Sequence, residues 1–463
     1  MRRAVAGLAL AALLAGCGWQ LRPTGSAPTS PGDAPVKTEP RLRDVLVTVL
    51  DGDTGRRLAG VRVAVGRRSA LTNAKGVAGV PIRRRAALVT TARHRGYIPR
   101  AVRLWYRQHP RSTMRIYQRS LQWPVYGADA ARTQAQSTIR VRPPFRVVWS
   151  RGIGSLIEFP AVVAEGVAYI GNYHGTIYAI SMRNGKVSWR YDPPGGKMAS
   201  SPAVYGDELV VHGMDGVVRV LDRDTGKLKR QLVIGSPIES SPVIANGLDL
   251  FGTWDGRVYA LDLERTRVRW TYRSGCKITS SAALAGGSMY IGDYCGRVLA
   301  LAPKTGSVRW SRGVNGRVYG TPAVGGGRVF VPSSTGGSLT AFTTGGRRLW
   351  SRGTGAYVYS SPALSGGHVY FGSYNGLLYC VSAATGATNW TVSAGGPISG
   401  AVTLVGGVAY AGSTRGRIVG ADAHTGRVLL RFPHGEYVPV SGSGRRLLLH
   451  GYSRLYAVEG RVG

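Results

Sequence analysis

The stretch that decides the fold runs from Ser360 to Trp390 and reads SSPALSGGHVYFGSYNGLLYCVSAATGATNW. Close copies occur at Ser280 to Trp310, SSAALAGGSMYIGDYCGRVLALAPKTGSVRW, and at Ser240 to Trp270, SSPVIANGLDLFGTWDGRVYALDLERTRVRW. The residue that closes each copy recurs every 40 or 41 positions, at Trp149, Trp189, Arg230, Trp270, Trp310, Trp350, Trp390 and Leu430. A fixed period of this length indicates a repeat architecture.

Each copy predicts four short strands. His368 to Ser373 alternates between polar and apolar residues, as a half-buried strand does. Asn375-Gly376 signals a hairpin turn, because both central residues of a type I′ turn need a positive φ. Thr385-Gly386 marks the next turn, and Trp390 lies in the fourth strand. Four such strands, repeated radially, are the signature of a β-propeller.

The blades of the propeller can be counted. The start of the innermost strand is predicted at eight positions: Pro160, Pro202, Pro242, Ala282, Pro322, Pro362, Gly400 and Pro439. The eighth unit, 437–458, holds only three strands, whereas Phe145 to Trp149 has the pattern of a fourth strand and follows no blade. We therefore predict an all-β chain whose eight-bladed propeller is closed by its N-terminal strand, so that no long sheet edge is exposed.

The repeat resembles a known family. Gly-x-x-Tyr-Ala-Leu followed by Thr-Gly-x-x-x-Trp is typical of the pyrroloquinoline-quinone-like, or quinoprotein-like, eight-bladed propellers. In this chain the pattern appears as Gly296 to Leu301, Thr305-Gly306 and Trp310, and the resemblance covers about residues 120–463. It implies the fold and two kinds of function: a quinone-dependent dehydrogenase, or the lipoprotein subunit of the outer-membrane β-barrel assembly machine.

The composition is strongly basic. The 463 residues hold 60 Lys and Arg against 23 Asp and Glu, a formal net charge of +37. The charge is densest in residues 41–119, with 19 basic and three acidic side chains. This density suits an anionic surface, such as lipid headgroups or a wall polymer, and it also fits an arginine-rich composition bias with no partner. A nucleic-acid partner is not expected, because the sequence carries no recognition motif.

Residues 1–17 predict a lipoprotein signal peptide. Arg2 and Arg3 precede an apolar segment, 4–15, that is too short to span a bilayer. Leu14-Ala15-Gly16-Cys17 resembles the bacterial lipobox, whose cysteine is acylated, for example with palmitate. We therefore expect Cys17 to anchor an exported, monomeric protein to the extracytoplasmic face of a bacterial membrane. An ordinary signal peptide is the alternative.

Two further segments precede the propeller, which we place at 120–463. Residues 18–40 are rich in Pro, Ser, Thr and Gly and predict a flexible tether. Residues 41–119 predict a small β-sandwich, because short strands recur about every ten residues, at 45–50, 61–65 and 87–91. Their turns, Asp51 to Gly55, Thr72 to Gly76 and Gly96-Tyr97, resemble those of carboxypeptidase-regulatory-like, transthyretin-like domains. That resemblance implies a non-catalytic module.

A quinone-dependent enzyme needs more than the fold. The resemblance implies a calcium ion, an acidic base and often a pair of adjacent cysteines, and this chain has no adjacent cysteine pair. Its eight histidines show no paired metal-ligand spacing. We predict no catalytic residues, metal or cofactor, and expect a non-enzymatic binding or scaffold module for an envelope protein or polymer. A quinone-dependent oxidoreductase and a carbohydrate-binding protein are the alternatives.

The residues leading into each innermost strand should rim one mouth of the central channel. Residues four places before the predicted start are mostly apolar, and alternation puts those three and five places before it on the opposite face. These two sets supply a basic and aromatic candidate rim: Lys197, Glu239, Lys277, Arg317, Tyr319, Tyr357, Tyr359 and Glu436. Such a rim suits an anionic or carbohydrate-like ligand or a peptide strand, and a solvated funnel without a ligand is the alternative. The entry segment Trp123 to Thr133 is expected to pack beneath the closing strand.

Two cysteines of the fourth unit predict a disulfide. Cys276 lies in the loop that enters the innermost strand, and Cys295 lies in the turn between the second and third strands. These positions fall at the same end of an up-and-down blade, and oxidising conditions outside the cytoplasm would preserve the bond. Free thiols are the alternative. Cys380 aligns with alanines of other third strands, which predicts a buried thiol without a partner.

Overall fold

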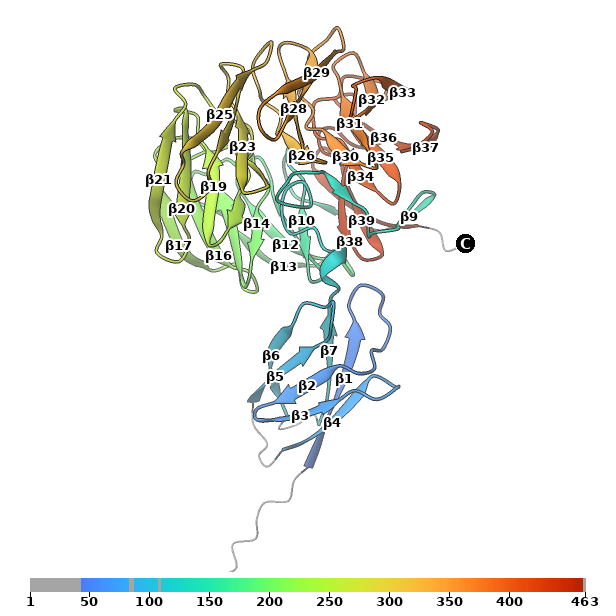
Figure 1. Cartoon of the computed structure of the whole chain (residues 1–463). Helices are drawn as coiled ribbons and strands as arrows, with labels where there is room; N and C mark the ends of the chain where they lie inside the picture. The colour runs from blue at the N-terminus through green and yellow to red at the C-terminus, as the bar shows by residue number, and fades with distance from the viewer. Residues whose placement is uncertain (1–42, 83–86, 107–109, 461–463) are drawn as a thin grey trace, which may run out of the picture.

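The computed structural model describes residues 43–82, 87–106 and 110–460. In these residues the chain is nearly all β, with a small sandwich below a ring of eight sheets (Figure 1). The predicted fold class is therefore confirmed. None of the described helical residues forms a span long and apolar enough to cross a membrane. The predicted signal peptide with Cys17 and the tether 18–40 lie outside the described residues.

The sandwich contains two sheets. One has the order β4 (Val77–Ile82), β1 (Arg43–Asp51), β7 (Arg111–Ile116), and the other β3 (Arg68–Leu71), β2 (Arg62–Val65), β5 (Ala87–Arg93), β6 (Arg100–Trp105). Alternate valines of β1, such as Val47, pack against alternate valines near β2, such as Val63, in one buried core. The alternation of buried and exposed residues in these strands fits the predicted β-sandwich. A short 3-10 helix, η1 (Arg119–Leu121), leads to the propeller.

Each blade is an antiparallel meander. The innermost strands are β10 (Val162–Ala164), β14 (Ala203–Tyr205), β18 (Val243–Ala245), β22 (Ala283–Ala285), β26 (Ala323–Gly325), β30 (Ala363–Ser365), β34 (Thr403–Val405) and β38 (Val440–Ser443). The second strands are β11 (Val167–Gly171), β15 (Glu208–His212), β19 (Leu248–Gly252), β23 (Ser288–Gly292), β27 (Arg328–Ser333), β31 (His368–Gly372), β35 (Val408–Ser413) and β39 (Arg446–His450).

The outer half of each blade follows the same order. The third strands are β12 (Ile177–Ser181), β16 (Val217–Asp222), β20 (Arg257–Asp262), β24 (Arg297–Leu301), β28 (Ser338–Thr343), β32 (Leu377–Ser382), β36 (Arg417–Asp422) and β40 (Arg454–Gly460). The outermost strands are β13 (Val187–Tyr191), β17 (Leu228–Val233), β21 (Arg267–Arg273), β25 (Val308–Gly313), β29 (Arg348–Gly353), β33 (Thr388–Ser393), β37 (Val428–Phe432) and β9 (Phe145–Gly152).

The Thr-Gly-x-x-x-Trp motif joins neighbouring blades. The indole Nε1 of Trp350 donates to the carbonyl oxygen of Ala383 in the next blade, at 3.2 Å. Gly386 of that turn packs on the same ring, and a Cβ at this position would lie 2.7 Å from it. Where Arg230 replaces the tryptophan, the turn of the next blade holds Thr266 instead of glycine, with φ at 50°. The repeated motif thus packs each blade against the next.

The N-terminal strand closes the ring as predicted. β9 pairs antiparallel with β40, with Trp149 opposite Ala457 and Phe145 opposite Gly460. The innermost strand of blade 8, β38, also contacts that of blade 1, β10. Both ends of the repeat array therefore hold the same blade, and β9 covers the edge that β40 would otherwise expose.

A series of hydroxyl groups joins the entrances to the innermost strands of blades 2 to 6. In each of these bonds the backbone N–H of one Ser or Thr donates to the hydroxyl of the equivalent residue in the next blade, at 2.9 to 3.1 Å. The donor and acceptor pairs are Ser201 to Ser241, Ser241 to Ser281, Ser281 to Thr321 and Thr321 to Ser361. At the closing seam the N–H of Ala161 donates instead to Nε2 of the buried His450, at 3.1 Å. Burial lowers the pKa of His450 to about 4, so this acceptor nitrogen is unprotonated at neutral pH.

The predicted start of the innermost strand is wrong in two blades. The residue directly before the strand is Pro202 in blade 2 but Ala161 in blade 1 and Val402 in blade 7. Pro160 and Gly400 are therefore one and two residues too early. Pairing with the second strand fixes this register, and a proline or glycine in the preceding loop does not.

The entry segment does more than pack beneath the closing strand, so that expectation is corrected. Residues 123–136 run across the innermost strands and end in β8 (Ala135–Gln136), which pairs with β34. Backbone N–H groups of Val204, Leu284, Val324, Leu364 and Leu404 donate to carbonyl oxygens of Pro124, Ala130, Ala131, Thr133 and Gln134, at 2.6 to 2.9 Å. We call residues 123–136 the plug, because they close one end of the channel.

The buried side chain of Arg132 fixes the plug. Its guanidinium donates to the carbonyl oxygens of Ala282 and Pro242, both at 2.8 Å, and to that of Tyr126. Burial lowers the pKa of Arg132 to about 10, which still leaves it charged at neutral pH. Backbone carbonyl groups thus replace the water around this cation.

The sandwich lies at the plugged end. The backbone N–H of Glu165 donates to Oε1 of Gln122 at 2.9 Å. The N–H of Gly444 donates to the carbonyl oxygen of Leu121 at 3.2 Å. Both turns join innermost to second strands, in blades 1 and 8. The candidate rim lies at the opposite strand ends, which are the other end of the blades.

Candidate binding site at the open mouth of the propeller

A cavity of about 250 Å³ lies at the open mouth. Tyr126 of the plug forms part of its floor, and its hydroxyl donates to Oγ of Ser361 at 3.2 Å. The other tyrosines that line it are Tyr294, Tyr319, Tyr359, Tyr374 and Tyr437. Two carboxylates, Glu158 and Glu239, also face it, and its described lining includes no Lys, Arg or His.

The repeat itself brings these residues together. Glu239, Thr279, Tyr319, Tyr359 and Ser399 recur every 40 residues at the entrance to the innermost strands. The hairpin turns between second and third strands supply a second set, Trp254, Tyr294 and Tyr374. The N–H of Tyr294 donates to the carbonyl oxygen of Lys277 at 2.9 Å, and the turns of other blades repeat this bond. Each blade therefore contributes two tied loops to the mouth.

The tyrosines form one continuous cluster. Tyr319 and Tyr359 stack with parallel rings at 5.1 Å. Tyr294 packs against Tyr319 at 4.4 Å, and Tyr374 meets Tyr359 edge to face at 4.8 Å. Tyr357 lies outside the cavity, 49% exposed, and its ring is 5.6 Å from that of Tyr359. The aromatic wall thus extends from the cavity to the surface across blades 4 to 6.

The two cavity carboxylates lie on the other side, in blades 1 and 3. Burial, followed by the neighbouring charge of Glu158, raises the pKa of Glu239 to about 7. Burial alone raises the pKa of Glu158. Glu239 accepts one hydrogen bond, from Trp254 Nε1 at 3.1 Å. Among the described residues Glu158 makes no ion pair or hydrogen bond, so this charge is left uncompensated.

The basic residues of the predicted rim lie outside the cavity. Lys277 Nζ is 3.2 Å from the ring centre of Trp254, and burial lowers the pKa of Lys277. Arg317 lies 5.8 Å from the ring centre of Tyr294, and Lys197 lies 5.4 Å from that of Tyr173. These cations lie over aromatic rings at the mouth, and none of the three lines the cavity. The expected basic rim therefore surrounds an acidic and aromatic cavity.

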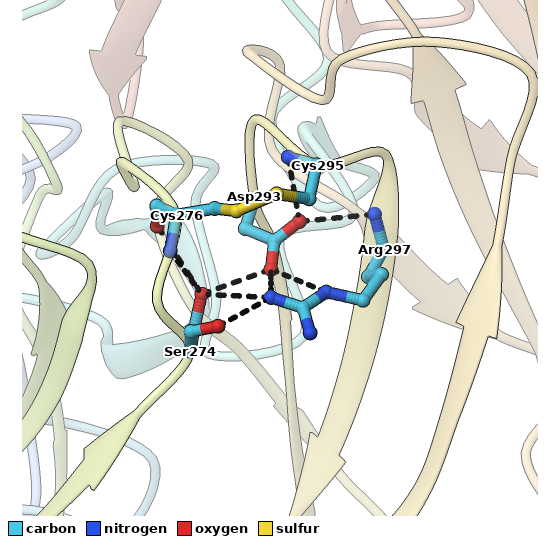
Figure 2. The surroundings of a disulfide bond; sticks show 5 residues. All are labelled: Ser274, Cys276, Asp293, Cys295 and Arg297. Atoms are coloured by element: carbon cyan, nitrogen blue, oxygen red, sulfur yellow. Dashed lines mark hydrogen bonds and ion pairs between the residues drawn. A yellow bond between two sulfur atoms is a disulfide. The ribbon is translucent and has the colours of Figure 1, made fainter.

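The structure joins Cys276 and Cys295 in a disulfide, with their Cα atoms 5.8 Å apart. Figure 2 shows the buried Asp293 beside it, which accepts hydrogen bonds from the N–H of Cys295 at 3.0 Å and from Oγ of Ser274 at 2.9 Å. Arg297 pairs with the same carboxylate at 2.7 Å. Because Lys277 and Tyr294 adjoin the cysteines, the bond fixes two side chains of the mouth.

In the described part of the chain Cys380 is a buried free thiol.

A second polar cluster lies inside the ring. His212 and Asp249, both fully buried, form a 2.8 Å contact through Nε2. The other imidazole nitrogen contacts the carbonyl oxygen of Ser240 at 2.6 Å, and the Ser240 hydroxyl has no partner. Among the described residues the imidazole therefore contacts a carbonyl oxygen and a carboxylate but no hydroxyl, and the three residues join blades 2 and 3.

Comparison with known proteins identifies the family. The family profile described as outer membrane protein assembly factor BamB matches residues 136–274, 254–363 and 337–460. The chain belongs to this family. Among solved structures, BamB from Moraxella catarrhalis matches with a TM-score of 0.59 at 18% identity, covering 69% of this chain and 99% of that one. Quinohemoprotein alcohol dehydrogenase from Comamonas testosteroni matches with a TM-score of 0.65 at 15% identity, covering 74% and 82%.

Curated relatives of this BamB-family chain fall into the same two groups. BamB of Shewanella oneidensis is 28% identical over 103 residues, 22% of this chain and 25% of that protein. The 1-butanol dehydrogenase (cytochrome c) of Thauera butanivorans is 28% identical over 160 residues, 28% of this chain and 23% of that protein. The chain thus matches about a quarter of the length of each relative.

The quinone used by the dehydrogenases of this fold does not fit the cavity. Pyrroloquinoline quinone is a polycarboxylate, and Glu158 and Glu239 would repel it in a cavity whose described lining holds no basic side chain. The described residues also contain no group of three His, Cys, Asp or Glu side chains placed to hold a metal ion. The lining therefore favours a ligand of the opposite charge.

The sequence located part of this site. Glu239, Tyr319 and Tyr359 line the cavity as the candidate rim requires, whereas Glu436 does not. Glu158 was missed because the one-residue error at Pro160 put Ile157 on the rim, and Ile157 is buried. Tyr294 and Tyr374 were missed because only the innermost-strand entrances were considered. The signal that could have found them is an aromatic residue after Gly-x in the hairpin turns of blades 1, 3, 4 and 6.

Proposed function

We propose that this chain is a non-enzymatic binding module of the bacterial envelope that holds a protein partner at its open mouth. The observation that carries the proposal is the tyrosine-walled cavity with two carboxylates, of which Glu239 accepts one hydrogen bond and Glu158 has no partner among the described residues. Tyrosine and tryptophan are enriched where proteins bind one another. Membership of the BamB family supports a role in assembly, because the relatives that bear this name are assembly factors.

The proposed arrangement orients the mouth. A lipid on Cys17 and the tether 18–40 would hold residues 41–119, which we propose to be a carboxypeptidase-regulatory-like module, near the membrane. The basic surface of that module would then face anionic headgroups. The propeller mouth lies at the end remote from the sandwich, so it would face away from the membrane and be accessible to a partner.

The partner is tested by capture from solubilised envelopes. A protein carrying Lys277→Ala, Arg317→Ala and Tyr359→Ala should fold with an unchanged melting curve and lose the partner. The matched control carries Lys304→Ala and Arg347→Ala in exposed turns at the other end of the blades and should capture it normally. Equal capture by both variants would move the site away from the mouth.

Membrane attachment is tested by fractionation. Cys17→Ala should leave the membrane pellet, because the lipid is the proposed anchor. If the variant sediments with the membrane like the wild type, the lipid anchor is wrong.

A quinone-dependent oxidoreductase is the second candidate, favoured by the match to a butanol dehydrogenase. It predicts that added quinone and calcium shift the cofactor absorbance on mixing with the protein. The acidic cavity predicts no such shift.

A further inference from the structure

The cavity at the open mouth holds two carboxylates and no cationic side chain of the described residues. Glu158 has no cationic partner among the described residues, and Lys277, the nearest positive contributor to Glu239, rests on Trp254 outside the cavity. Glu158 and Glu239 are both half-buried. Partial removal of a carboxylate from water without a cationic partner costs free energy, which a bound cation would offset. The elevated pKa of both carboxyl groups agrees with this deficit.

The aromatic wall suits the same ligand. The faces of tyrosine rings are electronegative and attract ammonium and guanidinium groups within about 6 Å. The chain already uses this attraction at the mouth, where Lys277 lies over Trp254 and Arg317 lies over Tyr294. Inside, the Tyr319, Tyr359 and Tyr374 rings have no cation of the described chain over them.

A buried hydroxyl adds an independent sign of a missing ligand. Thr279 is 5% exposed and lines the cavity. Its Oγ1 lies near the Tyr294 hydroxyl, but among the described residues no hydrogen bond of good geometry reaches this oxygen. Buried polar atoms of native proteins usually have a partner. An N–H donor entering the cavity would supply one.

The size of the cavity limits what can enter. Its volume of about 250 Å³ is below the range of about 300 to 1,000 Å³ typical of pockets for drug-sized ligands, and the plug closes its floor. One extended side chain matches such a space. Around the opening, exposed aromatic side chains such as Trp254, Tyr357 and Tyr452 provide a surface on which the rest of a polypeptide can pack.

We propose that the cavity binds one organic cation, the ammonium or guanidinium group of a lysine or arginine side chain on the protein partner. This inference rests on the proposed function and specifies the chemistry of its site. The chain has a net charge of +37, so non-specific electrostatics would repel a cationic ligand. Binding of such a ligand would therefore indicate a specific site.

The first test uses the full chain and small probes in calorimetric titrations. N-acetyl-arginine methylamide and N-acetyl-lysine methylamide should bind, and the neutral analogue N-acetyl-citrulline methylamide should bind at least about tenfold more weakly. Glu158→Gln combined with Glu239→Gln should weaken the cationic probes by a similar factor. Glu264→Gln, an exposed carboxylate on the same blade as Glu239, is the matched control and should bind normally.

Equal binding of the arginine and citrulline probes, absence of probe binding, or binding unchanged in the double variant would overturn the cation site. Melting curves of the variants check that they are folded. Capture from envelopes separates the two proposals. If the double variant captures the same partner as the wild type, the cation site is wrong and the binding function stands. If the wild type captures no partner, the binding function itself fails. A free amine that binds and displaces no captured partner would assign the cavity to a small-molecule cation instead.

Discussion

The two ends of the propeller channel treat buried charge in opposite ways. At the plugged end, Arg132 is fully buried and donates to backbone carbonyl oxygens of the plug and of blades 3 and 4. At the open end, Glu158 has no partner in the described chain, and Glu239 has one hydrogen bond from Trp254. The first arrangement is complete and therefore structural. The second is incomplete, which is what a ligand site requires in the free protein.

The largest expected effect comes from breaking the complete end. Arg132→Ala removes the guanidinium and leaves several buried carbonyl groups without donors. We expect a loss of about 3 to 5 kcal/mol in the free energy of unfolding, measured by denaturant titration. Arg312→Ala, on the outermost strand of blade 4, is the control for a lost arginine and should cost far less. A melting midpoint of Arg132→Ala equal to that of the control would contradict a structural role.

The disulfide at the open end is expected to have the next largest effect. Replacing Cys276 and Cys295 together by serine should lower the free energy of unfolding by up to about 3 kcal/mol, because the closed loop restricts the unfolded chain. Cys380→Ala controls for a lost thiol away from the mouth. Peptide mapping of the exported, non-reduced protein should find both cysteines protected from alkylation. Recovery of the two as alkylated thiols would rule out the bond.

A smaller effect of opposite sign is expected for Glu239→Gln. The folded-state pKa of Glu239, about 7, is above its unfolded value, so the fold favours the protonated form. The charged form therefore destabilises the protein above about pH 7, and this cost disappears as the pH falls through 7 toward the unfolded pKa. Glu239→Gln should stabilise the free protein by about 1 to 3 kcal/mol near pH 8 and by almost nothing near pH 4.

Paired melting curves at these two pH values check the effect, and Glu264→Gln should show no such change. A variant that is destabilised near pH 8 would mean that Glu239 is already well paired in the free protein.

The sequence predicted the repeat far better than the site. The period marked by Trp310, Trp350 and Trp390 sufficed for the blades and their closure, because each tryptophan packs on the glycine turn of the next blade. The plug could not be foreseen, since an irregular segment that pairs with several strands has no period. The residues of the mouth were predicted only in part. The one-residue error at Pro160 placed the buried Ile157 at the position that Glu158 occupies in the cavity lining. The residues of the binding site depend on the exact strand register, whereas the number of blades depends only on the period of the repeat.

The ionisation of Glu239 tests the central claim most directly. A titration of the glutamate-labelled protein by carbon NMR, assigned with Glu239→Gln, reports this carboxyl group. Our account predicts a pKa of about 7 in the free protein and a lower pKa when the arginine probe is added, because the bound cation stabilises the charged form. An ordinary glutamate pKa in the free protein, or one that the probe leaves unchanged, would contradict the account.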